Sequence, residues 1–211
     1  MKKFITNFCK TNTSLLVFIS LMLVFRSAVA DWNDVPTGSM KPTIVEGDRI
    51  FINKMAYDLK LPFSQKTLIK FADPERNDIV IFESKVAKKR LVKRVIGIPG
   101  DTISMQNNQL SINHQVADYT VVSQQKEYTL SQERIADHTH LIRTQVQPGN
   151  NNQPHRANFN EITIPDGFYL MMGDNRDNSA DSRSIGLVPR EEIIGRSNTV
   201  AFSLNYEQYL M

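Results

Sequence analysis

The feature that most limits the fold is a series of short runs rich in Val, Ile, Leu and Phe, each about the length of one strand. Gly, Pro, Asn and Asp, which favour turns, lie between these runs. No long amphipathic helix and no internal repeat is visible, and only a short helix is expected, at residues 189–194. The part of the chain after residue 30 is therefore predicted to be mostly β. The expected strands lie at residues 49–54, 78–83, 91–96, 109–113, 161–164, 168–172 and 199–203.

Length and composition narrow the class of protein further. A chain of 211 residues has room for one sizeable domain, or for one domain with an insertion. Hydrophobic residues at 41% and charged residues at 22% are ordinary globular values, which excludes wholesale disorder. A net charge of +3 is too small to indicate a nucleic-acid partner. The single cysteine, Cys9, excludes an intrachain disulfide and a cysteine-based zinc cluster.

The N-terminal segment differs in character from the rest. Three lysines precede an apolar run at residues 15–25, which is followed by Arg26 and the small residues 28–30. On pattern alone a cleavable signal peptide is favoured. The alternative is a membrane anchor over residues 11–30, with Arg26 reaching to the interface. In both interpretations the basic residues 1–10 stay in the cytoplasm and the remaining chain lies across the membrane.

The segment at residues 35–43 presents a serine on a stiff turn. Gly38 can adopt backbone angles that other residues avoid, and Pro36 and Pro42 restrict the flanks. Ser39 is therefore predicted to be a hydroxyl held in a fixed and open position. The alternative is a plain linker that follows the membrane segment.

A second unusual feature is a lysine within a predicted strand. Lys93 and Arg94 point to opposite faces of the strand at 91–96, so one of the two cations must lie among apolar neighbours. This alternation also argues against a nucleic-acid patch. Burial lowers the pKa of a lysine below its free value of about 10.4, and a neutral amine is a general base. The alternative is a lysine that extends along the surface to water.

The third feature is the polar segment at residues 173–183. Its short Asp and Asn side chains favour bonds to nearby backbone, and its arginines favour paired bonds to carboxylates. Asp181 is expected to pair with Arg183, and Asp174 with a basic residue elsewhere. Calcium binding is a competing interpretation, but the Gly and terminal Glu of an EF-hand loop are missing. We predict no metal and no cofactor.

The three segments, in this order and behind an apolar segment, resemble the bacterial type I signal peptidase (leader peptidase) family of Ser/Lys proteases. The resemblance covers roughly residues 35–101 and 166–202, and it rests on all three motifs together. It implies a mostly β fold of coiled antiparallel sheets with a small inserted β region, preceded by one transmembrane helix. The implied divisions are a cytoplasmic N-terminus at 1–10, an anchor at 11–30, a catalytic β core at 31–101 plus 166–211, and an insert at 102–165.

The resemblance also implies roles for individual residues. Ser39 matches the nucleophile, Lys93 the general base, and Ser179 a serine that orients the lysine. The oxyanion hole would use the N–H of Ser39 and the hydroxyl of Thr37, where the best-known members have Ser. The charges expected to brace the loop are Arg94, Asp174, Asp181 and Arg183.

Substrate selection follows from the same resemblance. Signal peptides have small residues at the first and third positions before the cut, so shallow apolar pockets are expected. The substrate would add as a strand beside the segments around Ser39 and Lys93. The first pocket would be lined by Val35, Pro36, Met40, Ile44 and Leu91, and the third by Ile50, Ile81 and Val92.

The expected partners are the signal peptides of exported preproteins and membrane lipid, with no nucleic acid and a monomeric chain. The expected location is the cytoplasmic (inner) membrane, crossed once, with the catalytic domain on the periplasmic face. Residues 28–31 resemble the enzyme's own substrate, so self-cleavage after Ala30 stays open. Two alternatives stay open as well: a protease dedicated to a pilin or secretion component, and a membrane-tethered β module that binds exported chains without cutting them.

Overall fold

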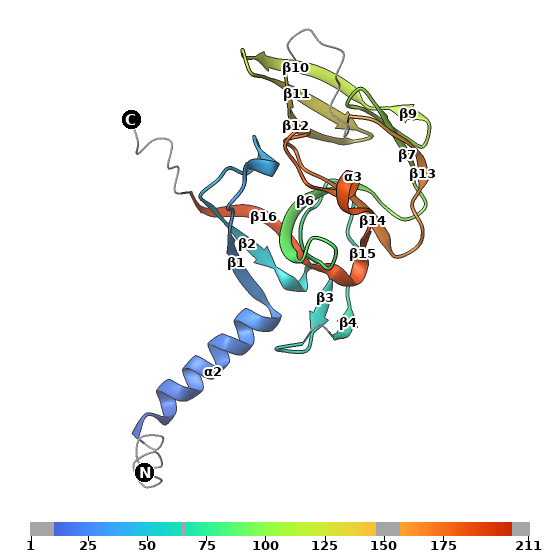
Figure 1. The fold of residues 1–211 in the computed structure, drawn as a ribbon. Coiled ribbons are helices and arrows are strands. Elements are labelled where there is room, and N and C mark those ends of the chain that lie inside the picture. Colours follow the sequence, from blue (N-terminus) through green and yellow to red (C-terminus); the bar gives the residue numbers. More distant parts are fainter. Residues whose placement is uncertain (1–10, 65, 147–156, 204–211) are drawn as a thin grey trace.

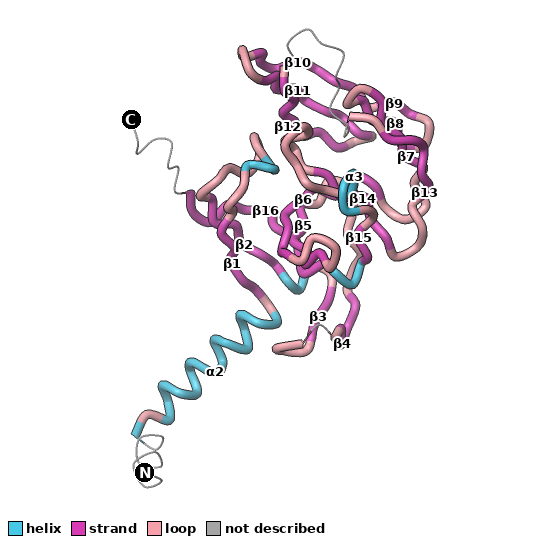
Figure 2. The backbone as a smooth tube through the Cα atoms, viewed as in Figure 1, coloured by secondary structure: helices cyan, strands magenta, loops and turns pink. Residues whose placement is uncertain are grey.

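A computed structural model describes residues 11–64, 66–146 and 157–203. The prediction of a mostly β chain is confirmed, and Figure 2 shows strands distributed along the whole described chain after the N-terminal helix. The largest sheet has seven strands, in the order β1-β2-β16-β5-β6-β14-β15, with antiparallel neighbours. Its strands are β1 (Ala30–Asp34), β2 (Asp48–Asn53), β5 (Ile79–Ser84), β6 (Lys89–Gly97), β14 (Phe168–Met172), β15 (Val188–Pro189) and β16 (Ile193–Ser203).

Two smaller sheets are formed by the segment predicted to be an insert. One has the strand order β13-β7-β8-β9 and the other β10-β11-β12. In Figure 1 they lie at the end of the molecule opposite to the N-terminal helix. The strands are β7 (Thr102–Gln106), β8 (Gln109–Ile112), β9 (Gln115–Val116), β10 (Asp118–Gln124), β11 (Tyr128–Ile135), β12 (His138–Gln145) and β13 (Phe159–Thr163).

The remaining elements are short, apart from the N-terminal helix α2 (Thr13–Ala28). A hairpin of β3 (Asp58–Lys60) and β4 (Thr67–Lys70) projects beside the end of α2 (Figure 1). The helix expected at residues 189–194 is a single 3-10 turn, because β16 already begins at Ile193. The other short helices are η1 (Gly38–Met40), η2 (Lys54–Ala56), η3 (Arg190–Glu192) and α3 (Ser182–Ile185).

All seven predicted strands are present, six of them with small changes of bounds, and the one predicted at 199–203 is the end of the longer β16. The sequence did not predict β1, β3, β4, β7, β9 and β15, nor β10, β11 and β12. The faces of the last three carry Thr, Ser, Gln and Glu at positions that an apolar pattern does not reveal. Residues 145–160 are polar and rich in Asn, Gln and Pro, which predicts a mobile loop, but most of this segment, residues 147–156, lies outside the described residues.

The transmembrane helix expected over residues 11–30 is not found. In the ranges that the structure describes, no helix is long and apolar enough to cross a membrane. Helix α2 has 16 residues, and a span needs about 20.

Three buried apolar clusters support the large sheet, and one of them lies behind the turn that carries Ser39. Strand β2 alternates strictly between buried and exposed side chains, so one of its faces enters this cluster. Strand β6 lies between β5 and β14 and is buried from Val95 onward on both faces. The cluster behind Ser39 consists of Val35, Met40, Ile44, Ile50, Ile52, Ile81 and Ile194.

Candidate active site

Ser39 lies in the middle of the 3-10 turn η1, between strands β1 and β2. Met40, the next residue, is buried in the apolar cluster beneath the turn and so ties the turn to the sheet. The backbone on either side is bonded to neighbouring chain: Val35 N donates to Asp48 O over 2.9 Å. The turn is therefore held from both sides, as the sequence predicted for a fixed hydroxyl.

Lys93 reaches Ser39 from the central strand β6. Its Nζ lies 2.6 Å from Ser39 Oγ and also donates to Val92 O over 2.9 Å. The lysine is only 2% exposed. Burial lowers the pKa of Lys93 to about 8, although the carboxylates of Asp181 and Asp174 act in the opposite direction. The amine is therefore neutral in a large fraction of molecules at pH 8, and a neutral amine accepts a proton.

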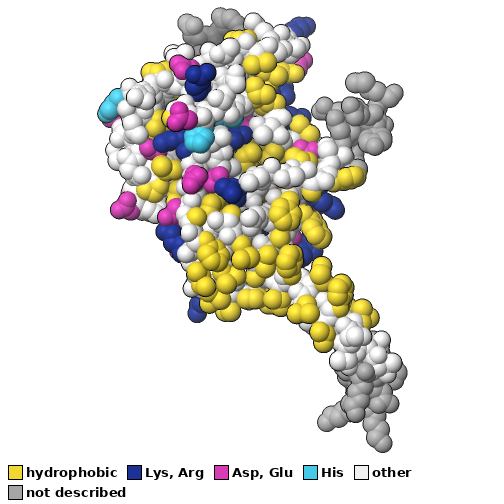
Figure 3. Space-filling view, turned by 180° about the vertical axis from the view of Figure 1, so that it is seen from behind, with side chains coloured by type: hydrophobic (Ala, Val, Ile, Leu, Met, Phe, Trp, Pro, Cys, Tyr) yellow, Lys and Arg dark blue, Asp and Glu magenta, His cyan; other side chains and the backbone are white. Residues whose placement is uncertain are grey.

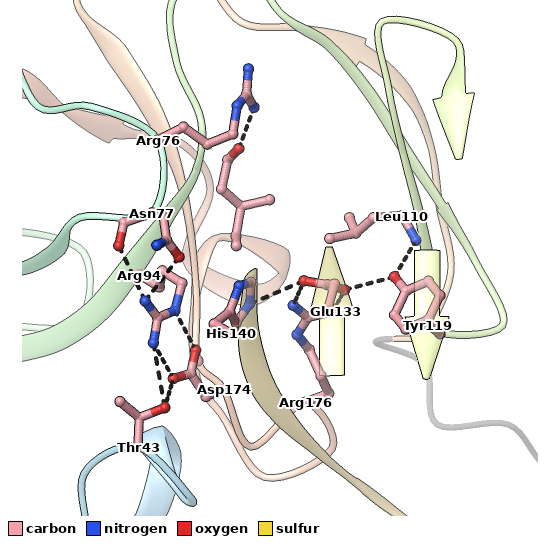
Figure 4. A network of polar contacts seen from close by, with 12 residues as sticks. Thr43, Arg76, Asn77, Arg94, Leu110, Tyr119, Glu133, His140, Asp174 and Arg176 are labelled. Carbon is pink, nitrogen blue, oxygen red and sulfur yellow. Dashed lines mark hydrogen bonds and ion pairs between the residues drawn. The ribbon is translucent and has the colours of Figure 1, made fainter. Parts of the chain in front are cut away.

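The two carboxylates near Lys93 are each paired with their own arginine. Arg94 Nε donates to Asp174 Oδ1 over 2.8 Å and Arg94 Nη2 to Oδ2 over 2.6 Å. Arg183 makes the same kind of paired contact with Asp181, at 2.9 and 2.8 Å. Burial raises the pKa of Asp181, but the bonds from Arg183 outweigh it and keep the pKa below its ordinary value. Both expected pairings are present, and Figure 4 shows the first of them.

The loop at residues 173–183 packs directly on the serine turn. Asn175 N donates to Ser39 O over 3.1 Å, and Asn175 Nδ2 donates to Gly38 O over 2.9 Å. Gly173 leaves no room for a side chain, because a Cβ there would lie 2.4 Å from Ser39 O and 2.3 Å from Ser179 Oγ. The buried Ser179 therefore packs against Gly173, close to the serine turn.

Some predicted residues are not close-packed around the dyad. Thr37 lies two residues before Ser39 in extended backbone, and its side chain is exposed, as is that of Pro36. Leu91 belongs to a different apolar cluster, around Phe82 and Tyr169, because it points to the other face of β6 from Val92.

The other predicted pocket residues lie together beneath the serine turn. They are almost fully buried, so they form a solid apolar floor rather than the walls of a deep cavity. Val92 is partly buried and packs against the same cluster. The residues of this floor are Val35, Met40, Ile44, Ile50, Ile81 and Val92.

The sequence did not single out three groups that the structure places in the site. Thr43 Oγ1 donates to Asp174 Oδ2 and so adds to the Arg94 pair (Figure 4). Asn175 joins the loop to the turn that carries Ser39, and Arg176 is buried against Glu133 of the insert. All three belong to the recognised segments or touch them, but their partners lie 43 to 137 residues away in the chain. A pattern of neighbouring residues in the sequence does not predict such contacts. In the described parts of the chain, no group of His, Cys, Asp and Glu could hold a metal ion.

The packing at Gly173 gives a direct test of the geometry. We expect Gly173→Ala to lower the free energy of unfolding by about 1–3 kcal/mol, since the new methyl overpacks the contact with Ser39 and Ser179. The displaced loop also changes the surroundings of Lys93. Urea unfolding measures the first effect, and titration of the Lys93 amine by NMR measures the second.

Gly195→Ala is the matched control. A Cβ at Gly195 would lie 2.5 Å from Asn53 O, at the contact of β16 with β2 and away from Ser39. This variant should lose stability to a similar degree and leave the pKa of Lys93 unchanged. A Gly173→Ala protein with wild-type stability and an unchanged Lys93 titration would show that this contact does not hold the site together.

Comparison with known proteins places this geometry in a family. The family described as signal peptidase, peptidase S26, matches residues 7–202. The chain is 36% identical to signal peptidase I of Pseudomonas aeruginosa over 199 residues, which is 87% of this chain and 68% of that protein. It is 34% identical to signal peptidase I of Pseudomonas fluorescens over 200 residues, with the same coverage. The crystal structure of a signal peptidase I from Enterococcus faecalis aligns with 60% of this chain and 98% of that chain, at 23% identity and a TM-score of 0.38. The chain therefore belongs to the signal peptidase family, peptidase S26, and is a serine peptidase.

Proposed function

We propose that this enzyme removes the N-terminal signal peptides of exported preproteins after small-x-small sites, with Ser39 as nucleophile and Lys93 as general base. The observation that carries the proposal is the 2.6 Å separation of Lys93 Nζ from Ser39 Oγ, with the amine buried. The names of the relatives support the substrate class, since each is called a signal peptidase I. Ser/Lys pairs are a known form of the nucleophile-and-base arrangement of serine hydrolases.

In this mechanism the neutral amine of Lys93 takes the proton of the Ser39 hydroxyl as Oγ attacks the scissile carbonyl carbon. The tetrahedral intermediate carries the charge on the former carbonyl oxygen. Collapse of the intermediate breaks the C–N bond, and the Lys93 ammonium gives its proton to the departing amine. The signal peptide is left as an ester on Ser39. Lys93 then activates a water molecule, which attacks the ester, and the serine hydroxyl is restored.

The oxyanion is assigned to two donors in the turn that carries the nucleophile. One is the N–H of Ser39 and the other the hydroxyl of Thr37. Thr37 is exposed in extended backbone two residues ahead of Ser39, so its hydroxyl is free to turn toward a bound carbonyl. Ser179, buried and next to Gly173, is assigned the role of orienting Lys93.

The apolar floor beneath the serine turn is assigned to the substrate side chains. Its members are nearly inaccessible to solvent, so a bound strand finds only shallow depressions above them. Alanine-sized side chains fit such depressions, whereas a larger side chain would have to displace packed core atoms at a cost of about 1–3 kcal/mol. We assign the first pocket to the side of Met40 and Ile44 and the third to the side of Ile50 and Ile81.

We also propose that the enzyme works at the inner membrane, with its N-terminus in the cytoplasm and its catalytic domain on the opposite face. Most side chains of α2 from Leu15 to Phe25 are apolar and exposed. The β3–β4 hairpin continues this surface, and Phe63 at its tip is 74% exposed while its N–H donates to Ser27 Oγ at the end of α2. Figure 3 shows hydrophobic side chains gathered over this part of the molecule. An exposed apolar surface of this extent is typical of a contact with lipid or another protein.

The membrane proposal predicts that the hairpin contributes to lipid binding. Full-length protein carrying Phe63→Asp and Ile69→Asp should bind vesicles of phosphatidylcholine and phosphatidylglycerol several-fold more weakly than wild type in a flotation assay, since the two charges oppose burial of the hairpin. Val122→Asp is the control, because Val122 is equally apolar and exposed but lies on β10, at the other end of the molecule. Equal binding of all three proteins would remove the hairpin from the membrane contact.

The dyad proposal predicts that Ser39→Ala and Lys93→Ala each abolish preprotein cleavage while the domain stays folded, because nucleophile and base act as a unit. Lys93→Arg should fail as well, since a guanidinium stays protonated. Cleavage of several unrelated preproteins, followed by gel electrophoresis, is the measurement. It also separates a general enzyme from one dedicated to a single substrate.

The pH dependence of turnover tests the assignment of Lys93 as the base. The pKa of Lys93 is lowered to about 8 and the neutral amine is the active form, so turnover should rise with pH through about 8 and level off above it. Substantial cleavage by Lys93→Arg, or a rate that is already maximal at pH 6, would exclude Lys93 as the base.

The oxyanion assignment predicts that Thr37→Val, which keeps the shape but removes the donor, lowers turnover by roughly 10²–10³ with a modest change in KM. Thr37→Ser retains the hydroxyl and lacks the methyl that restricts rotation, so it should cleave at the wild-type rate or faster. Steady-state kinetics on a peptide substrate separate the two parameters. If Thr37→Val cleaves as fast as wild type, the hydroxyl does not serve the oxyanion.

A further inference from the structure

The inserted region and the catalytic loop share backbone hydrogen bonds. Strand β12 is at the edge of the sheet β10-β11-β12, and the segment around Asn175 pairs with it as a short parallel bridge to Arg143. Arg143 N donates to Asp174 O over 2.8 Å, and Arg176 N donates to Arg143 O over 2.9 Å. The loop that packs on Ser39 is therefore also an added edge of a sheet in the insert.

A buried ion pair holds the loop to the insert beside this bridge. Arg176 and Glu133, which lies on β11, are both 0% exposed. Arg176 Nη1 donates to Glu133 Oε1 over 2.7 Å, and Nη2 donates to Oε2. Tyr119 OH donates to Glu133 Oε1 over 2.6 Å, and His140 Nε2 lies 3.1 Å from Oε2. Figure 4 shows Tyr119 of β10, His140 of β12 and Arg176 of the 173–183 loop converging on the carboxylate of Glu133.

Each charge of this ion pair depends on the other, because neither side chain is in contact with water. Burial alone raises the pKa of Glu133, but Arg176 and His140 outweigh this and hold the pKa well below its ordinary value. Removing one partner would leave the other as a buried charge without compensation, which is strongly unfavourable. Arg176 is thus confined to one position relative to the insert.

From Arg176 the connection to the dyad is short. The preceding residue, Asn175, donates to the backbone of both Gly38 and Ser39. Arg183 Nη2 donates to Arg176 O over 2.6 Å, and the same arginine neutralises Asp181, one of the carboxylates that act on Lys93. A shift of Arg176 would therefore be transmitted to the nucleophile turn and to the charges around the base.

We propose that Glu133 and Arg176 are positioning residues of the peptidase, and that the inserted region is part of its catalytic apparatus because this pair holds the 174–176 segment against Ser39. The chemistry rests on the proposed Ser/Lys mechanism, whereas the positional effect can be measured on Lys93 without any substrate.

The test uses the full-length double variant Glu133→Gln with Arg176→Gln. It removes both charges together, so no unpaired buried charge remains, and the two amides cannot reproduce the paired contact. We expect turnover to fall about 10- to 100-fold with KM near the wild-type value. We also expect the pKa of Lys93, followed by NMR titration of its amine, to rise from the wild-type value as water gains access. Ile135→Val is the control, because Ile135 is buried in β11 but belongs to an apolar cluster that contains no residue of the 173–183 loop.

Asp177→Ala is the second variant and covers the case in which the double variant does not fold. Asp177 is partly buried, and its carboxylate accepts hydrogen bonds from Gln145 N and Asn108 Nδ2, which fastens the loop to the insert at a neighbouring point. It should change turnover and the pKa of Lys93 in the same direction, by a smaller amount.

The possible outcomes are distinct. Folded variants that keep wild-type turnover and an unchanged Lys93 titration would overturn the inference and leave the proposed function intact. A loss that appears only in KM, or equally in Ile135→Val, would also overturn it. A wild-type protein that cleaves no preprotein would contradict the proposed function instead, and the Lys93 titration of the variants would still decide whether the insert positions the base.

Discussion

The site depends on a lysine amine that is buried without a counter-charge of its own. Burial lowers the pKa of Lys93 and so favours its neutral form, whereas the nearby carboxylates of Asp181 and Asp174 act to raise the pKa. Each of these carboxylates is bonded in a paired contact to an arginine, which reduces the negative charge that the amine experiences. The ion pairs of the loop thus shield the amine of Lys93 from negative charge, in addition to any contribution to stability.

Prediction from the sequence succeeds for the strands that carry the site, because their apolar runs are local features. Strands such as β5 and β6 have apolar runs, and both charge pairs around Asp174 and Asp181 were expected. Alternation along β6 predicted that Lys93 or Arg94 is buried, and the structure buries both. The reason is tertiary: apolar clusters pack on both faces of β6, with Leu91 and Val95 in one cluster and Val92 and Ile96 against others, so neither face is open at this point.

The insert is where prediction from the sequence fails. Strands β10–β12 are largely polar on one or both faces, and half-polar strands in a small sheet lack an apolar pattern. The Glu133–Arg176 pair could not be predicted either, since an isolated Glu on a polar strand normally faces solvent. Leu91 shows a different limit: the family resemblance placed it in the first pocket, but alternation along β6 turns it to the face opposite to Val92, where it joins another apolar cluster.

The contacts that complete the site join the two ends of the domain. Asn175 bonds to Gly38 across 137 residues, and Thr43 bonds to Asp174 across 131. A ribosome makes Ser39 early and the loop that positions it late, with the whole insert between them. A nascent chain that ends before residue 173 therefore holds Ser39 and Lys93 but lacks the groups that place them, so the arrangement around the two side chains can form only after the loop has been made. Contacts between residues that lie far apart in the chain also form more slowly than local ones. The polypeptide is therefore made some time before its site is assembled.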